Sequence, residues 1–185
     1  MLQRADVPYQ PFYCEENVWQ LCRHPAMACR TVFVVFIFGR ASAIPLWHQR
    51  AARSPEWPVF WDYHAVLMTT GRPSAAVWDL DSVLDWPVPL EAYLAATFKI
   101  ALPEVHAPIF RVVNGGDFLA TFSSDRSHMR DAKGGFIAPP PPWPAPARGP
   151  SNLRDFTGRG NTLPGRLTGL AGMTAFAKTG VWGTV

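Results

Sequence analysis

One run of eight residues, at positions 31–38, restricts the fold of this chain more than any other segment. It reads Thr-Val-Phe-Val-Val-Phe-Ile-Phe, so every side chain is β-branched or aromatic, and Gly39 follows it. Such a run is typical of a buried strand. It is far shorter than the roughly 20 apolar residues that a membrane-spanning helix needs. We therefore expect a globular domain with a sheet at its centre.

The composition is that of a single soluble domain. The chain has 185 residues, of which 48% are hydrophobic and 17% charged, which suits one packed core rather than a disordered chain. Its net charge of +3 is small and its basic residues are scattered, which gives little support for nucleic-acid binding. The first residues contain no apolar signal core, so a secreted protein is not expected.

The three cysteines point to a reducing compartment. Cys14, Cys22 and Cys29 are odd in number and contain no Cys-x-x-Cys pair, so we expect free thiols in the cytoplasm or nucleus. Together with His24 they could suggest zinc, but spacings of eight and seven residues match no common structural site.

A helix is predicted to begin near Cys14 and to run to about Cys22. Val18 and Leu21 lie on the same helical stripe as these two cysteines. The residues after Cys14 are glutamates, which suit the first turn of a helix. A thiol at a helix N-terminus is expected to have a lowered pKa.

A hairpin is predicted between strands at residues 59–69 and 75–81. A turn centred between Gly71 and Arg72, with Pro73 inside its loop, would place Thr69 opposite Ser74 and His64 opposite Asp79. Opposed side chains point to the same face and are close enough for an imidazole to meet a carboxylate. A slip of one residue would separate them.

A thiol, an imidazole and a carboxylate are the parts of an activated-cysteine hydrolase. In that interpretation His64 takes the thiol proton of Cys14, Asp79 orients the imidazole, and the Cys14 backbone N–H binds the oxyanion. Each residue also has a structural interpretation, because buried cysteines and strand histidines are commonly part of a core. Asp81, on the same face, competes with Asp79 for its role.

Two further segments have alternative interpretations. Ser127 and His128 are neighbours in sequence, which seldom form a catalytic dyad, so an ordered loop or helix end is expected there. Residues 139–144 read Pro-Pro-Pro-Pro-Trp-Pro and must be extended. They could bind an SH3 or WW groove of a partner, or pack against their own domain.

Several longer runs, in their order along residues 9–156, resemble the protein N-terminal glutamine amidohydrolases. The runs are Tyr-Cys-Glu-Glu-Asn, Ile-Pro-Leu-Trp, Trp-Asp-Tyr-His, Trp-Asp-Leu-Asp, Ser-Asp-Arg-Ser-His-Met and Pro-Pro-Pro-Pro-Trp-Pro.

The resemblance implies a fold and a reaction. The implied fold is α+β, a papain- or transglutaminase-like single domain with an antiparallel sheet packed against helices. A Cys-His-Asp triad matches at Cys14, His64 and Asp79. The implied enzyme deamidates the N-terminal glutamine of a protein or peptide to glutamate, releasing ammonia through a thioester, and feeds the arginylation branch of the N-degron pathway. It needs no metal or cofactor and acts as a monomer, without nucleic acid or membrane.

A free α-amino group must be recognised, so acids should line the pocket. The candidates are Glu15, Glu16, Asp62 and Asp125. The alternatives to this enzyme are another papain-like thiol hydrolase or transglutaminase, or an impaired variant that acts as an interaction protein through its proline-rich run.

The end of the chain departs from the family pattern. Residues 1–156 are expected to form the catalytic domain. The Gly-rich segment 157–185 is expected to be poorly ordered and to lack the family's closing helix.

Overall fold

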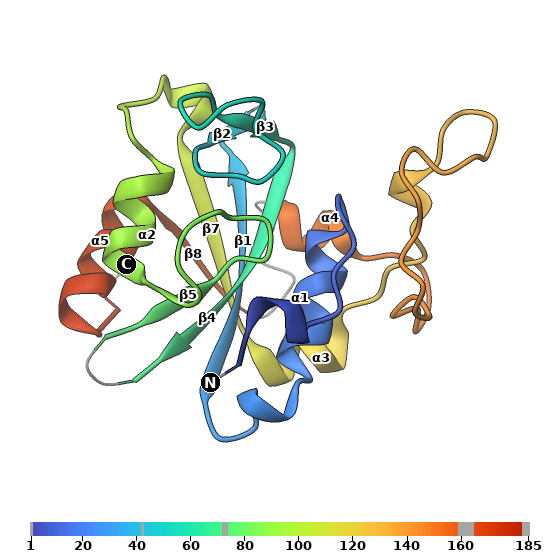
Figure 1. Ribbon diagram of the computed structural model, residues 1–185, viewed down its shortest axis with the longest axis horizontal. Coiled ribbons are helices and arrows are strands. Elements are labelled where there is room, and N and C mark those ends of the chain that lie inside the picture. The colour runs from blue at the N-terminus through green and yellow to red at the C-terminus, as the bar shows by residue number, and fades with distance from the viewer. Residues whose placement is uncertain (1, 42, 72–73, 159–164, 183–185) are drawn as a thin grey trace.

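An antiparallel sheet forms the centre of the molecule (Figure 1). The structure is a computed structural model that describes residues 2–41, 43–71, 74–158 and 165–182. Within these residues the main sheet has the strand order β6-β5-β4-β1-β7-β8, and all neighbouring strands are antiparallel. The strands are β1 (Thr31–Gly39), β4 (Tyr63–Thr70), β5 (Ala76–Trp78), β6 (Val88–Pro89), β7 (Pro108–Asn114) and β8 (Arg166–Gly169). A second, smaller sheet pairs β2 (Ile44–Leu46) with β3 (Val59–Trp61).

The predicted buried strand is β1, which lies between β4 and β7. Its side chains alternate between two apolar clusters on opposite faces of the sheet. Phe36 and Phe38 belong to one cluster, whereas Val35 and Ile37 belong to the other. Because both faces of β1 are apolar, both must be covered by helices.

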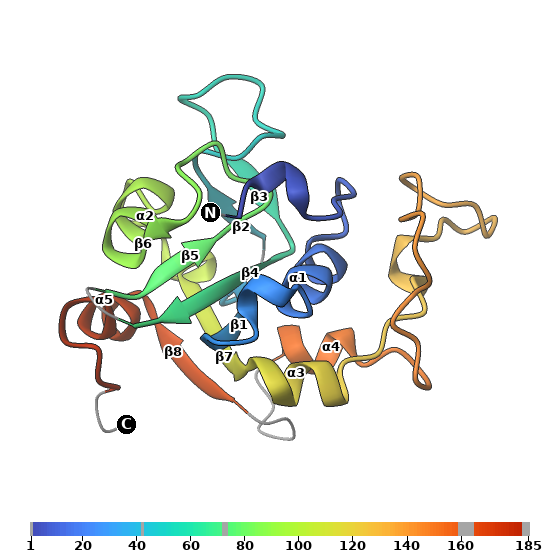
Figure 2. The ribbon, with the colours of Figure 1, turned by 60° about the horizontal axis from the view of Figure 1, so that its bottom comes forward.

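Helices cover both faces of the sheet (Figures 1 and 2). One face carries α1 (Cys14–Cys22), α3 (Gly115–Thr121) and α4 (Leu153–Thr157). The other carries α2 (Leu90–Thr97) and α5 (Leu170–Thr179). This arrangement confirms the single-domain α+β architecture, with an antiparallel sheet packed against helices. No helix in the described ranges is long and apolar enough to cross a membrane.

Helix α1 begins at Cys14, as the sequence predicts. Its apolar stripe, formed by Cys14, Val18 and Leu21, is buried against the sheet. The helix packs on β4, so its first turn lies beside the strand that carries His64.

The β4–β5 pairing is shifted by two residues from the predicted register. The prediction placed Thr69 opposite Ser74, but Thr69 pairs with Ala76. Strand β5 ends one residue before Asp79, so this aspartate lies just outside the ladder. A shift of two residues keeps every side chain on its predicted face. For this reason the contact between His64 and Asp79 forms despite the wrong register.

The predicted strand at residues 59–69 is interrupted at Asp62. Its first part, β3, pairs with β2 in the small sheet, and its second part, β4, joins the main sheet. Arg72 and Pro73, on which the predicted turn depended, lie outside the described residues.

The segment 157–185, which the sequence predicts to be poorly ordered and to lack a closing helix, contains a strand and a helix in the part that the structure describes. Strand β8 pairs with β7, and α5 packs against α2 and β7. Met173 and Phe176, one helical turn apart, are buried in the second apolar cluster. The glycines and threonines around them hid this short amphipathic pattern. Residues 159–164 and 183–185 lie outside the described residues.

The proline-rich segment packs against its own domain. Residues 138–143, which we call the strap, run past the first turn of α1. The Tyr13 hydroxyl donates to the Ala138 carbonyl at 3.1 Å. The Arg126 guanidinium donates to the Pro141 carbonyl at 3.3 Å. These contacts favour the intramolecular interpretation of the proline run over that of a partner-binding motif.

A buried ion pair fastens the strap to α1. Both carboxylate oxygens of Glu16 accept hydrogen bonds from Arg126, each at 2.7 Å. The Trp143 indole N–H donates to the same carboxylate at 2.9 Å. The Glu16 side chain is fully buried and that of Arg126 is only 10% exposed. Three segments that are distant in sequence are thereby held at the residues that surround Cys14.

We predict that Glu16→Gln lowers the free energy of unfolding by about 3 kcal/mol, because it leaves the Arg126 guanidinium buried without a counter-charge. The matched control is Glu104→Gln, which removes an exposed ion pair with Arg40 at 3.4 Å. That change should cost less than about 1 kcal/mol. Urea denaturation measures both. Equal effects of the two substitutions would contradict the role given to the buried pair.

Candidate active site

Cys14 lies at the N-terminus of α1 and lines a cleft. The residue is only 6% exposed. The thiol donates to Glu15 Oε2 at 3.6 Å. The backbone of Ala65 in β4 interacts with the sulfur and lowers the pKa of the thiol.

The pKa of the Cys14 thiol is raised well above its ordinary value. Burial is the main cause, the charge of Glu15 is the next, and the hydrogen bond from Ala65 acts in the opposite direction. The predicted lowering by the helix N-terminus is therefore wrong for this state of the site. The reason is that the sulfur is removed from water beside a carboxylate.

His64 and Asp79 form a buried pair. His64 Nε2 lies 3.0 Å from Asp79 Oδ1, and both side chains are almost fully buried. Burial opposes the charged imidazole, but the charge and hydrogen bond of Asp79 outweigh it and raise the pKa of His64. The Trp61 ring stacks on the imidazole at a centroid distance of 5.7 Å, and the same ring lines the cleft with Cys14. The second ring nitrogen, Nδ1, has no hydrogen-bond partner among the described residues.

The structure distinguishes Asp79 from Asp81. Burial would raise the pKa of Asp79, yet His64 and hydrogen bonds from the Asp81 N–H and the Gln49 amide lower it. By contrast, the pKa of Asp81 is raised, chiefly by burial. Asp79 is thus the carboxylate that is stabilised as an anion beside His64.

Three residues that sequence reasoning missed complete this network. The Tyr93 hydroxyl and the Gln49 amide donate to Asp79 Oδ2 at 2.9 and 3.3 Å. The Tyr9 hydroxyl donates to Asp81 at 2.6 Å. They come from α2, from the loop after β2 and from the N-terminal segment, and no local pattern in the sequence marks them.

His64, Asp79 and Asp81 are the one group in the described ranges whose ligand-type atoms lie close together, within 4.8 Å of one another. A metal could be considered there. However, both oxygens of Asp79 and one oxygen of Asp81 already accept hydrogen bonds from protein donors. We therefore interpret the group as a hydrogen-bond network. The three cysteines and His24 do not form such a group in the described part of the chain.

The cleft above Cys14 has a volume of about 310 Å3. Phe12, 51% exposed, lies at its edge with a φ of 70°, a conformation that is rare for a bulky residue and is often found at functional sites. His128, for which the sequence predicted an ordered loop or a helix end, lies in the 3-10 turn η4 (Ser127–Met129) and lines this cleft. The lining residues are Phe12, Cys14, Trp61, Asp62, Tyr63, His128, Met129 and Ile137.

The four candidate acids have different environments. Glu16 is fully engaged with Arg126 and Trp143. Asp125 is exposed, does not line the cleft, and accepts the Ser127 N–H at 2.9 Å. Asp62 is exposed at the cleft wall.

Glu15 is buried beside Cys14. Its Oε2 accepts the Tyr63 hydroxyl at 2.9 Å, and its Oε1 lies 3.3 Å from His128 Nε2. Glu15 is therefore the candidate acid that the structure places against the thiol.

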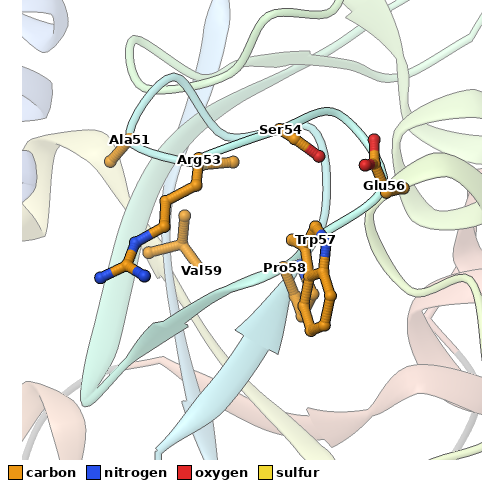
Figure 3. A pocket seen from close by; sticks show the side chains of 8 residues that line it. Ala51, Arg53, Ser54, Glu56, Trp57, Pro58 and Val59 are labelled. Atoms are coloured by element: carbon orange, nitrogen blue, oxygen red, sulfur yellow. The ribbon is translucent and has the colours of Figure 1, made fainter.

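A larger hollow, of about 590 Å3, lies inside the loop between β2 and β3 (Figure 3). It contains none of the predicted site residues. Arg53 and Glu56 supply its charged side chains. The smaller cleft combines a thiol, a histidine and acids, so we place the candidate active site there.

Comparison with known proteins identifies the family of this chain. A family model described as N-terminal glutamine amidase matches residues 9–175. The protein N-terminal glutamine amidohydrolase of Bos taurus is 39% identical over 158 residues, which are 80% of this chain and 75% of the relative. The human protein of that name is 39% identical over 158 residues, 80% and 76% of the two chains. That of Drosophila pseudoobscura pseudoobscura is 40% identical over 147 residues, 76% and 72%. The match extends past residue 156 into β8 and α5. The chain belongs to the N-terminal glutamine amidase family.

Proposed function

We propose that this protein hydrolyses the side-chain amide of an N-terminal glutamine in proteins and peptides, yielding glutamate and ammonia. The observation that carries the proposal is the buried His64–Asp79 pair next to a cleft that contains Cys14. The names of the relatives supply the substrate, since each is a protein N-terminal glutamine amidohydrolase.

In the proposed first half-reaction, the Cys14 sulfur attacks the carboxamide carbon of the glutamine side chain. His64 takes the thiol proton and gives it to the leaving nitrogen, which departs as ammonia and leaves a thioester. In the second half-reaction, water attacks the thioester while His64 takes a proton from the water. That proton returns to the sulfur as the glutamate product leaves.

The orientation of the imidazole suits this role. Asp79 engages Nε2, so the opposite nitrogen, Nδ1, is left for proton transfer. Asp79 would hold the ring and stabilise the imidazolium that forms. The Cys14 backbone N–H has no acceptor within the helix, because Cys14 is the first residue of α1, and we assign it to the oxyanion.

We also retain three expectations that the family resemblance implies. They are a papain- or transglutaminase-like triad fold, a monomeric protein of cytoplasm and nucleus, and a place in the arginylation branch of the N-degron pathway. The layered architecture, with the thiol at a helix start packed on the sheet, supports the first of them.

The direct test compares three peptides of otherwise identical sequence. One begins with Gln, one begins with Asn, and one contains Gln only at an internal position. We expect ammonia from the first peptide alone. Release from internal glutamine would favour a transglutaminase-like enzyme instead. If the folded protein releases ammonia from none of the three peptides, the proposal is refuted.

We predict that Cys14→Ala lowers the rate of ammonia release by at least about 10³-fold, because the nucleophile is lost. Its thermal unfolding should remain cooperative. Cys22→Ala is the matched control, since the Cys22 thiol lies outside the cleft and contacts the Gly115 carbonyl. Full activity of the Cys14 variant would remove this residue from the mechanism.

Asp79→Asn should reduce kcat on the order of 10³-fold, because the imidazole loses the anion that orients it. Asp81→Asn should reduce kcat by about 10-fold or less, because Asp81 acts on His64 only at longer range. Steady-state kinetics with the Gln-initiated peptide compares the two. The reverse ranking would show that Asp81 is the orienting carboxylate.

A further inference from the structure

The thiol of Cys14 is bound to a carboxylate and not to an imidazole. Its S–H donates to Glu15 Oε2, which also accepts the Tyr63 hydroxyl. Meanwhile His64 Nδ1, the nitrogen needed for proton transfer, is buried without a hydrogen-bond partner in the described part of the chain. The site is thus seen in an arrangement in which nucleophile and base are not yet coupled.

Among the residues that the structure describes, the Glu15 carboxylate does not have hydrogen bonds to both of its oxygens. Its side chain is fully buried, and Oε1 has no hydrogen bond from any described residue. His128 Nε2 lies 3.3 Å from this oxygen but in a geometry that makes no hydrogen bond. A buried carboxylate oxygen without a donor is costly and indicates a missing partner. The side chains that touch Glu15, namely Cys14, Tyr63 and His128, all line the cleft.

A cationic donor that reaches the cleft would supply the missing hydrogen bond and a counter-charge for the buried carboxylate. In the proposed substrate, a short aliphatic chain joins the side-chain carboxamide to the α-ammonium. Glu15 Oε2 lies 3.6 Å from the sulfur that would attack that carboxamide. One glutamine residue can therefore place its carboxamide at Cys14 and its ammonium at Glu15. An internal glutamine has no such cation.

The next inference rests on the proposed function. We propose that Glu15 binds the free α-ammonium of the substrate, and that it holds the Cys14 thiol away from His64 until the ammonium has bound. The ammonium displaces the His128 ring from Oε1 and forms an ion pair with the Glu15 carboxylate. The thiol then turns from Glu15 to His64, and its proton moves from Sγ to Nδ1.

The charge of the bound ammonium also favours activation of the Cys14 thiol. Glu15 is the second cause, after burial, of the raised pKa of Cys14. An ammonium that neutralises Glu15 lowers the pKa of the thiol, and this favours transfer of its proton to His64. Recognition of a free N-terminus and activation of the sulfur thereby become one event.

The first experiment measures the thiol without any substrate. In a Cys22→Ser, Cys29→Ser background, Cys14 is the remaining cysteine, and its alkylation by iodoacetamide is followed by mass spectrometry at neutral pH. Glu15→Gln should accelerate alkylation by about threefold or more, since the thiolate population rises while its nucleophilicity falls only in part. Glu104→Gln, which alters an exposed acid outside the cleft, should leave the rate unchanged.

The second experiment measures recognition. Wild-type protein and Glu15→Gln are given a Gln-initiated peptide and its desamino analogue, in which hydrogen replaces the α-ammonium. Wild type should strongly prefer the first. Glu15→Gln should lose about 10–100-fold of that preference in kcat/KM, the worth of one charge-assisted hydrogen bond. A variant that is merely distorted would lose activity on both peptides equally.

The outcomes separate this inference from the proposed function. If wild type releases no ammonia from Gln-initiated peptides, the proposed function fails, while the alkylation rates still report on the Glu15–Cys14 contact. If wild type is active but Glu15→Gln keeps its preference for the ammonium, or alkylates no faster, the inference is overturned.

Discussion

The fold depends on the need to bury both faces of β1. A strand with apolar side chains in both directions is stable only inside a sheet that is covered on both sides. Strands β4 and β7 pair with the backbone of β1, and two layers of helices cover its two apolar faces. The candidate site follows from this requirement, because α1 covers one face at the place where β4 begins. Cys14 at the helix start is therefore brought next to the segment that carries His64.

Much of the site could be predicted because its key elements are local. The start of α1 follows from the apolar stripe and the acids of its first turn. The His64–Asp79 contact was predicted from alternation along two strands, and it tolerated an error of two residues in register because an even shift preserves the face. Helix α5 was missed because glycines and threonines surround the two apolar residues that anchor it.

The features that could not be predicted depend on contacts between residues that are far apart in sequence. Tyr9, Gln49 and Tyr93 reach the two aspartates from three separate segments, and nothing in their local sequence indicates it. The thiol pKa was mispredicted for a related reason. Helix position is a local property, whereas burial of the sulfur beside Glu15 depends on how α1 packs against the sheet. The electrostatics of the site belongs to the assembled fold rather than to any motif.

The strap determines how early during synthesis the surroundings of Cys14 can assemble. Tyr13 and Glu16 flank the nucleophile, but their partners in the strap and Arg126 are more than 100 residues further along the chain. A ribosome synthesises Cys14 many seconds before it reaches Trp143. During that interval the nascent chain has the cysteine but not the contacts that fix its surroundings. The surroundings of Cys14 are therefore completed only after Arg126 and the strap have been synthesised.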